Sequence, residues 1–248
     1  MSSRPKFFVA REQINNNKVT LTGSDVSHIR TVLRLEAGDS IQVISDSDKW
    51  LTVRLVEVKT KEVKGEVVAS VTINVESPLA VHLGQALTKG NKFDVILRKS
   101  VELGVRSITP LMTERCVVKT HRTEVGKKIE RWKKIVLESS KQCGRSKIPL
   151  VAEDVETLET FCRKNDHQDL KLIFWELEEK KTLKDIKLDV QPRSVAVLIG
   201  PEGGFSQAEI ENVREYGFQT VGLGPRILRA ETAPVVALAL LQSRWGDL

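Results

Sequence analysis

The feature that most constrains the fold of this chain is an alternation, from residue 80 onward, of apolar strand-like runs with helical patterns. Alternation of this kind predicts a parallel sheet with helices on both faces, the α/β fold class. The unbroken run SVAVLI is typical of a strand buried on both sides. The strand-like runs are AVHLGQAL, SITPLM, LKLIFWE, SVAVLIG and TVGLG, and the helical patterns lie near residues 91–103, 122–142, 155–165, 206–216 and 232–245.

The first part of the chain has a different pattern, in which short β-prone runs are separated by turn residues. The runs are KVTLTG, DSIQVISD, KWLTVRLVEVK and KGEVVASVTI. They predict a small β-barrel. One helical interruption is expected at residues 25–35, with Ile29, Val32 and Leu33 on its apolar face.

The two patterns meet around Glu76-Ser77-Pro78. With 248 residues, the chain is long enough for two modest domains. We therefore expect a barrel domain at residues 1–75 and an α/β domain at residues 76–248.

The charge balance favours an anionic partner. The chain has 39 Lys and Arg residues against 33 Asp and Glu residues, a formal net charge of +6, so nucleic acid is the first candidate. A basic but merely solvated surface explains this excess equally well. The cysteines Cys116, Cys143 and Cys162 are far apart and form neither a disulfide framework nor a metal-binding motif. We therefore expect no metal site.

No export or membrane signal is evident in the sequence. The N-terminus, MSSRPKFFVAREQ, lacks an apolar segment of signal length. The most apolar run, Val235 to Leu241, is far too short to span a bilayer. We expect a cytosolic (cytoplasmic) protein with no membrane partner.

A glycine-rich turn, Gly200-Pro201-Glu202-Gly203-Gly204, follows the most apolar strand. It has neither the GxGxxG spacing of a dinucleotide site nor the Lys-Ser/Thr ending of a P-loop. Ser206 and Glu209 form a capping box, which occupies the amide groups that a phosphate needs. The turn therefore favours a ligand that is neutral or cationic at its centre. The alternative is a tight turn whose glycines serve the backbone alone.

Two further loops lie at the ends of strands, where open α/β sheets bind ligands. Glu176 follows the strand LKLIFW, and the segment 225–232 follows the strand TVGLG. Thr232 is expected to cap the last helix and Pro234 to stand in its first turn. Because this helix is apolar on every face, we expect it to be buried all round, either in the monomer core or in a subunit interface.

Together these segments resemble the bacterial 16S ribosomal RNA uridine-N3 methyltransferases, a family of the SPOUT (trefoil-knot) class. The resemblance covers nearly the whole chain. The segments that carry it are HIRTVLRLEAGD, HLGQALTKGNKFDVILRKSVELGV, ITPLMTERCVVK, SKQCGRSKIP, LIGPEGGFSQAEI and LGPRILRAETAPVVALALLQSRWGDL. One departure is Lys6 before Phe7-Phe8, where the family often has Arg; here Arg4 lies two residues earlier.

The resemblance implies a deep trefoil knot in the second domain, a PUA-like RNA-binding first domain and a homodimer whose active site is completed across the interface. It also implies S-adenosylmethionine as the methyl donor. Glu202 is expected either to face this cationic donor or to cap backbone amides, and Trp175 either to stack on it or to belong to the core. The expected cofactor-binding residues are Phe174, Trp175, Glu176, Leu198, Ile199, Gly200, Pro201, Glu202, Gly203, Gly204, Leu223, Gly224, Ile227, Leu228, Arg229, Thr232 and Ala233.

Methylation at N3 of uracil requires an unpaired or flipped base, because N3 lies on the Watson–Crick edge. Neutral N3 is a poor nucleophile, so the site must stabilise negative charge on O2 and O4 or remove the proton. Arg229 is the first candidate for this role and Arg226 the second, because a guanidinium stays charged. Glu231 is expected to orient an Arg or to accept the proton. The alternative for Arg229 and Glu231 is a structural salt bridge.

The expected substrate is 16S ribosomal RNA within the small ribosomal subunit. Three alternatives remain open: another RNA position (a ribose 2′-OH or a transfer RNA base), a non-catalytic RNA-binding protein, and a nucleotide-dependent oxidoreductase. RNA contacts are expected from basic residues, part of which are merely solvated. The candidates are Lys6, Arg11, Arg30, Arg34, Lys89, Lys92, Arg115, Lys119, Arg122 and Arg145.

Overall fold

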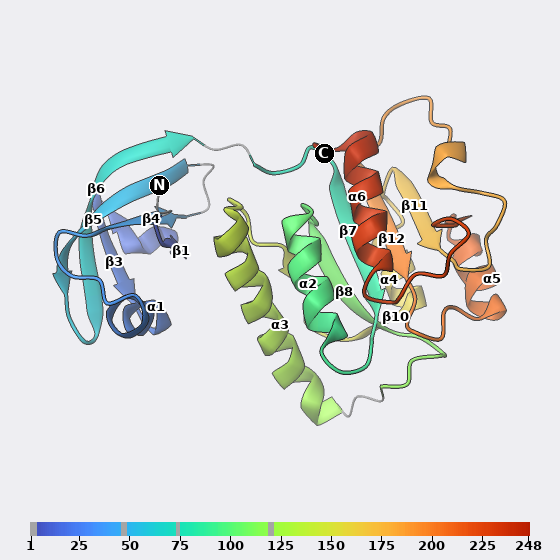
Figure 1. The fold of residues 1–248 in the computed structure, drawn as a ribbon, viewed down its shortest axis with the longest axis horizontal. Coiled ribbons are helices and arrows are strands. Elements are labelled where there is room, and N and C mark those ends of the chain that lie inside the picture. Colours follow the sequence, from blue (N-terminus) through green and yellow to red (C-terminus); the bar gives the residue numbers. More distant parts are fainter. Residues whose placement is uncertain (1–3, 46–48, 73–74, 119–121) are drawn as a thin grey trace. The chain divides into compact units, whose positions relative to one another are not determined.

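The computed structural model describes residues 4–45, 49–72, 75–118 and 122–248 (Figure 1). The chain forms two compact units. Unit 1 comprises Met1–Glu76 and Ser140–Lys147, and unit 2 comprises Ser77–Ser139 and Ile148–Leu248. The main division lies next to the expected boundary, whereas the assignment of Ser140–Lys147 to unit 1 was not indicated by any local pattern.

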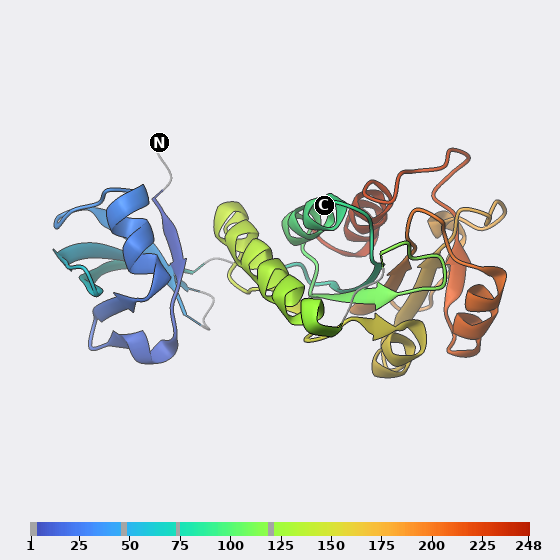
Figure 2. The same cartoon turned by 90° about the horizontal axis from the view of Figure 1, so that it is seen from below.

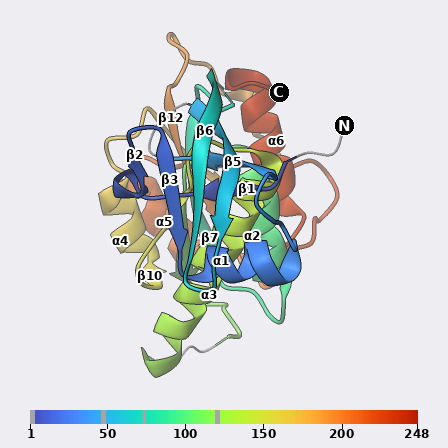
Figure 3. The same cartoon turned by 90° about the vertical axis from the view of Figure 1, so that its left-hand side faces the viewer.

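Unit 1 is built on a six-stranded sheet in the order β1-β4-β5-β6-β3-β2 (Figure 3). β1 is parallel to β4, and the other neighbours are antiparallel. The pairing of β5 with β6 shifts register between Thr52 and Val53 and again between Leu55 and Glu57, and such bulges bend a sheet. The strands are β1 (Lys6–Phe8), β2 (Ile14–Asn15), β3 (Lys18–Thr22), β4 (Ser40–Ile44), β5 (Lys49–Val58) and β6 (Glu62–Thr72).

The sheet of unit 1 curls around an apolar core that includes Phe7, Leu21 and Ile41. Three short helical segments accompany it, η1 (Arg11–Gln13), α1 (Ser24–Ser27) and η2 (His28–Val32). Val26 and Ile29 bring α1 and η2 into the core. Among the described residues, β1 and β2 are the two edge strands and do not pair with each other. The sheet therefore curls but does not close into the expected barrel.

The helical interruption lies where the sequence predicted it, but its second half is a π-helix. The Leu33 N–H donates to the His28 carbonyl five residues earlier, at 2.9 Å. This wider turn changes which residues share a face. Ile29 is fully buried, whereas Val32 is 68% exposed, so the prediction that Val32 lies on the apolar face was wrong.

Unit 2 contains the predicted parallel sheet, in the order β10-β8-β7-β12-β11-β13, with β9 also paired to β8. All of these pairs are parallel. The five predicted strands are all present, and β9 and β10 were not expected. The strands are β7 (Ala80–Ala86), β8 (Ser107–Met112), β9 (Leu150–Val151), β10 (Glu156–Thr157), β11 (Leu170–Phe174), β12 (Ser194–Ile199) and β13 (Gln219–Val221).

Helices cover both faces of this sheet, as Figure 2 shows for α2 and α6 on one side and α4 and α5 on the other. Successive residues of β12 alternate between the two apolar clusters, with Val197 in the first and Leu198 in the second. The first cluster includes residues of α2, α3 and α6, and the second includes residues of α4 and α5. The helices are α2 (Lys92–Glu102), α3 (Arg122–Cys143), α4 (Leu158–Lys164), η3 (Leu183–Asp185), α5 (Gln207–Glu215) and α6 (Ala233–Trp245).

The last helix is less buried than its sequence suggested. Leu238 and Leu241 of α6 are fully buried, but Leu240 is 43% exposed and Val236 is half-buried. Burial on every side is therefore wrong for the chain by itself. None of the helices in the described ranges is long and apolar enough to cross a membrane.

Candidate functional site

Three strands that end side by side define the candidate site. β11 lies between β12 and β13, and Phe174 is level with Ile199 on one side and with Val221 on the other. The loops after these three strands therefore leave the sheet at the same edge. They are the loops that the sequence analysis singled out.

The glycine turn after β12 is shaped by close packing against Glu176. Gly204 has a φ of +67°, and a Cβ there would lie 1.7 Å from Glu176 Oε1, so only glycine fits. The predicted capping box is confirmed. Ser206 Oγ accepts from the Glu209 N–H at 3.3 Å, and Glu209 Oε2 accepts from the Ser206 N–H at 2.9 Å. These amides are occupied, which agrees with a ligand that has no phosphate.

Glu202 is held by groups from the loop after β7. Its Oε1 accepts from the Lys89 N–H at 3.1 Å and from Lys92 Nζ at 3.0 Å. Burial raises the pKa of this carboxyl, but the hydrogen bonds from Lys92 and from backbone N–H groups outweigh that effect, and the pKa of Glu202 lies below its ordinary value. Of the two roles expected for Glu202, the structure shows the capping role.

The loop after β13 carries the two arginines that the sequence analysis selected. Arg226 and Arg229 are exposed, and Ile227 between them is 83% exposed. Glu231 is 3.6 Å from Lys92 Nζ through its Oε2. In the described part of the chain no ion pair joins Arg229 to Glu231, and Glu231 pairs with Lys92 instead, so the salt-bridge alternative fits Glu231 but is not supported for Arg229.

The start of α6 differs from the expectation for Thr232. Its side chain makes no capping hydrogen bond, and its backbone is already helical, with φ −89° and ψ −39°. Instead, the Arg229 carbonyl accepts from the N–H groups of Thr232 and Ala233, at 2.8 and 3.0 Å. This turn fixes the Arg229 backbone directly before the helix. Pro234 stands in the first turn as predicted.

The loop after β8 clamps the glycine turn from the other side. Arg115 Nη1 donates to the Gly203 carbonyl at 3.0 Å, and the Glu114 N–H donates to Glu209 Oε1 at 2.8 Å. Arg115 was expected to contact RNA. It is exposed, but the contact that the structure shows is with the turn. Sequence analysis did not anticipate this clamp, because its partners are 88 and 95 residues apart.

Buried polar atoms without a hydrogen-bond partner gather at this edge of the sheet. Among the described residues they include Gln85 Oε1, Thr88 Oγ1, Trp175 Nε1 and Glu231 Oε2. Such atoms are rare in folded proteins and indicate a bound ligand or ordered water. Gln85 and Thr88 were missed by the sequence analysis, although their position in the last residues of β7 and directly after it is the signal that could have found them.

The candidate RNA-contacting residues fall into several environments. Arg11, Arg30 and Arg34 are exposed on unit 1, and Lys89 is exposed on unit 2. Lys6 is half-buried, with Nζ 5.7 Å from the centre of the Trp50 ring. Arg30 and Arg34 line a shallow hollow of about 310 Å³. Lys119 lies outside the described residues, as does the side chain of Arg122.

Arg145 departs from the expectation of an RNA contact. It is only 5% exposed, and its Nη2 is 2.6 Å from Glu76 Oε2 within unit 1. Glu76 also accepts from the N–H groups of Ser146 and Lys147, both at 3.0 Å. This buried ion pair gives Arg145 a structural role.

Comparisons with known proteins agree with this architecture. Residues 75–242 match the model of an RNA methyltransferase domain, and residues 21–68 match that of an RNA methyltransferase PUA domain. Proteins called ribosomal RNA small subunit methyltransferase E are similar over most of their length. The Buchnera aphidicola (subsp. Acyrthosiphon pisum) protein is 32% identical, covering 98% of this chain and 94% of its own. The Bacillus subtilis protein is 34% identical, covering 90% and 88%.

Two solved structures are similar over 99% of both chains. A Legionella pneumophila protein in complex with SAM has a TM-score of 0.90 at 39% identity. A ribosomal RNA small subunit methyltransferase E from Neisseria gonorrhoeae, bound to S-adenosyl methionine, has a TM-score of 0.85 at 33% identity.

The fold and the matched domains define an RNA methyltransferase of the SPOUT class with an N-terminal PUA domain, which confirms the expected fold class. Within that class, the chain belongs to the family of ribosomal RNA small subunit methyltransferase E.

Proposed function

We propose that this protein transfers a methyl group from S-adenosylmethionine to N3 of a uridine in 16S ribosomal RNA, as a cytoplasmic homodimer acting on the small ribosomal subunit. The names of its relatives and the donor bound in two similar structures support this proposal. The observation that carries it is the convergence of a glycine turn unsuited to phosphate with a loop that presents Arg226 and Arg229.

The residues at this edge of the sheet fit the methyl donor. The turn at Gly204 is closed by Glu176, so a carboxylate faces the region of the glycine turn. Exposed apolar side chains flank it, with Ile227 83% and Leu177 63% exposed. When bound, S-adenosylmethionine supplies an activated methyl group on a sulfonium cation, which a carboxylate attracts rather than repels. We assign binding to the backbone and apolar groups of the three loops.

Arg229 is the proposed catalytic residue. As the N3 proton passes to solvent, negative charge develops on O2 and O4 of the uracil, and a guanidinium beside the base stabilises it. The Arg229 backbone is fixed by the α6 start, while its side chain is exposed to an incoming base. Arg226 is the second candidate. Glu231 lies next to Lys92. This contact favours a role for Glu231 in positioning the loop after β13, rather than in orienting Arg229.

A homodimer is supported by the exposed apolar face of α6. Val235, Val236, Ala239 and Leu240 follow the i, i+1, i+4, i+5 spacing of one helix face. They are half-buried or exposed in the single chain. Covering this face with a second copy would remove apolar surface from water. Because α6 begins directly after the Arg229 loop, the partner would lie close to the site.

The substrate is tested by mass mapping of 16S ribosomal RNA from a strain that lacks the gene. We expect the loss of one N3-methyluridine and its return when the gene is restored. An unchanged modification pattern, or the loss of a different modification, contradicts the assignment. Calorimetry with S-adenosylmethionine tests the alternative of a non-catalytic RNA-binding protein, which predicts no binding.

The catalytic residue is tested with Arg229→Ala. Loss of the guanidinium should reduce kcat about 100- to 1,000-fold, while S-adenosylmethionine binding measured by calorimetry changes little. Arg193→Ala is the matched control, because Arg193 is also exposed but directly precedes β12, at the opposite edge of the sheet. Near-normal turnover of Arg229→Ala would rule out the proposed role.

A further inference from the structure

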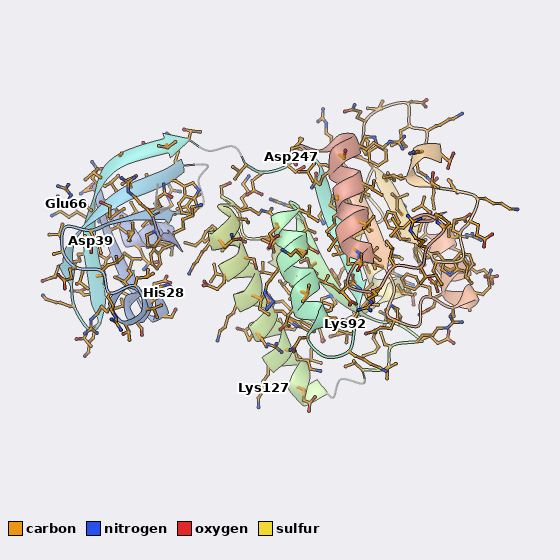
Figure 4. All side chains as sticks on the ribbon, viewed as in Figure 1. His28, Asp39, Glu66, Lys92, Lys127 and Asp247 are labelled. Carbon is orange, nitrogen blue, oxygen red and sulfur yellow. The ribbon has the colours of Figure 1, made fainter. Side chains whose placement is uncertain are left out.

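Lys92 makes an ion pair with each of two loops of the site. It is the first residue of α2, and its Nζ is 3.0 Å from Glu202 Oε1 and 3.6 Å from Glu231 Oε2. Glu202 belongs to the glycine turn after β12, and Glu231 to the loop after β13. Figure 4 labels Lys92 at the start of α2, near the loop that leads into α6.

The sheet itself does not link these two loops. β12 and β13 both pair with β11 and not with each other. Within the described ranges, no backbone hydrogen bond joins Gly200–Gly204 to Leu223–Thr232. The separation of the two loops therefore depends on side chains, and the Lys92 ammonium group lies between their carboxylates.

The charges at Lys92 act on loop position more than on global stability. The side chains of Lys92, Glu202 and Glu231 are 37%, 25% and 24% exposed, and partly exposed ion pairs contribute little to folding. Without the ammonium group, however, two carboxylates would face each other across the gap and repel. Glu231 Oε2 is buried and has no hydrogen-bond partner, so Lys92 provides its compensating charge.

We propose that Lys92 is a positioning residue that sets the distance between the glycine turn and the Arg229 loop, and thereby both donor affinity and the aim of Arg229. This inference rests on the proposed function. Arg229 lies two residues before Glu231, and its carbonyl fixes the start of α6. Movement of Glu231 is therefore transmitted directly to Arg229. The hydrogen bond to Glu202 raises the pKa of Lys92, in keeping with a charge that is retained at neutral pH.

The test compares Lys92→Met, which keeps length but removes charge, with Lys92→Arg, which keeps the charge. For Lys92→Met we expect a higher KM for S-adenosylmethionine and a lower kcat, with kcat/KM reduced about tenfold to hundredfold and thermal stability unchanged. Lys92→Arg should remain close to wild type. Lys99→Met is the matched control, since Lys99 lies on the same helix in an exposed pair with Glu102.

A second variant separates loop repulsion from other effects. Adding Glu231→Gln to Lys92→Met removes one of the two facing carboxylates, so part of the lost donor affinity should return. Normal kcat and KM for Lys92→Met, or a loss that follows a fall in thermal stability, overturns the positioning role. A wild-type protein that does not bind S-adenosylmethionine overturns the proposed function as well, whereas donor binding without methylation of ribosomal RNA overturns only the substrate assignment.

Discussion

At the scale of single residues, the carboxylate of Glu202 indicates what the glycine turn can bind. It takes hydrogen bonds from the Lys89 N–H and from Lys92, and the capping box of Ser206 and Glu209 occupies further amides. A phosphate would need the same donors and would meet a negative charge beside them. The side chains around the turn therefore discriminate between ligands more strongly than the glycine pattern alone.

Arg34 gives a prediction in which stability and RNA affinity change in opposite directions. Its φ of +52° is in the left-handed region, which costs a non-glycine residue about 1 kcal/mol. Arg34→Gly should raise the free energy of unfolding by about 0.5–1 kcal/mol, measured by urea denaturation. If Arg34 contacts an RNA phosphate, the same variant should bind RNA less tightly and lower the slope of log Kd against log salt by about one.

Arg34→Lys is the control for that experiment, because it keeps both the charge and the backbone strain. It should leave the free energy of unfolding unchanged and retain most of the RNA affinity. Equal RNA binding and an equal salt slope in Arg34→Gly and wild type would remove Arg34 from the RNA-binding surface. The other half of the prediction fails if Arg34→Gly is less stable than wild type.

At the scale of elements, local patterns predicted most of the fold, and contacts between distant residues account for what they missed. The strands and helices of unit 2 follow apolar periodicity, which is a local property. The two-residue strands β9 and β10 are too short to show such a pattern. Arg145 was assigned to RNA as a basic residue, because no local pattern shows its partner Glu76, which is 69 residues away. The link from Lys92 to Glu202 spans 110 residues and was equally invisible.

The Glu76–Arg145 pair should hold the segment Ser140–Lys147 on unit 1. Removing the charge of a half-buried, hydrogen-bonded carboxylate leaves its donors unsatisfied, so Glu76→Gln should lower the free energy of unfolding by about 1–3 kcal/mol. Glu57→Gln is the control, because Glu57 pairs with the exposed residues Lys59 and Lys64, and its loss should lower the stability much less than the loss of Glu76. Equal stability of the two variants would contradict the structural role of this pair.

The same pair gives a defined pH dependence. Burial raises the pKa of Glu76, but the hydrogen bonds and charge of Arg145 outweigh it, and the pKa lies below its ordinary value of 4.5. Since the folded pKa is lower than the unfolded one, the stabilisation is complete above the unfolded pKa and is lost as pH falls through the folded pKa. Denaturation from pH 7 downward should show wild type and Glu76→Gln converging only below about pH 4.5. A constant difference across that range would contradict this.

At the scale of the whole molecule, α6 joins the candidate site to the proposed dimer. Its buried side, including Leu238 and Leu241, belongs to the core of unit 2, and its N-terminal turn is fixed by Arg229. The other side presents Val236 and Leu240 to solvent in the single chain. In the proposed dimer, a second copy would cover this remaining apolar side. Dimerisation and catalysis should therefore depend on each other.

Leu240→Lys tests that dependence. A lysine in an apolar interface buries an unpaired charge, which is strongly unfavourable. Sedimentation should therefore show a mass near twice 27.8 kDa for the wild type and near 27.8 kDa for Leu240→Lys. Methylation should fall with it, because a monomer would lack the partner's part of the site. Val190→Lys is the matched control, since Val190 is 80% exposed in the segment before β12 and should change neither. A Leu240→Lys protein that remains dimeric, or a monomer that keeps full activity, would show that α6 does not couple assembly to the site.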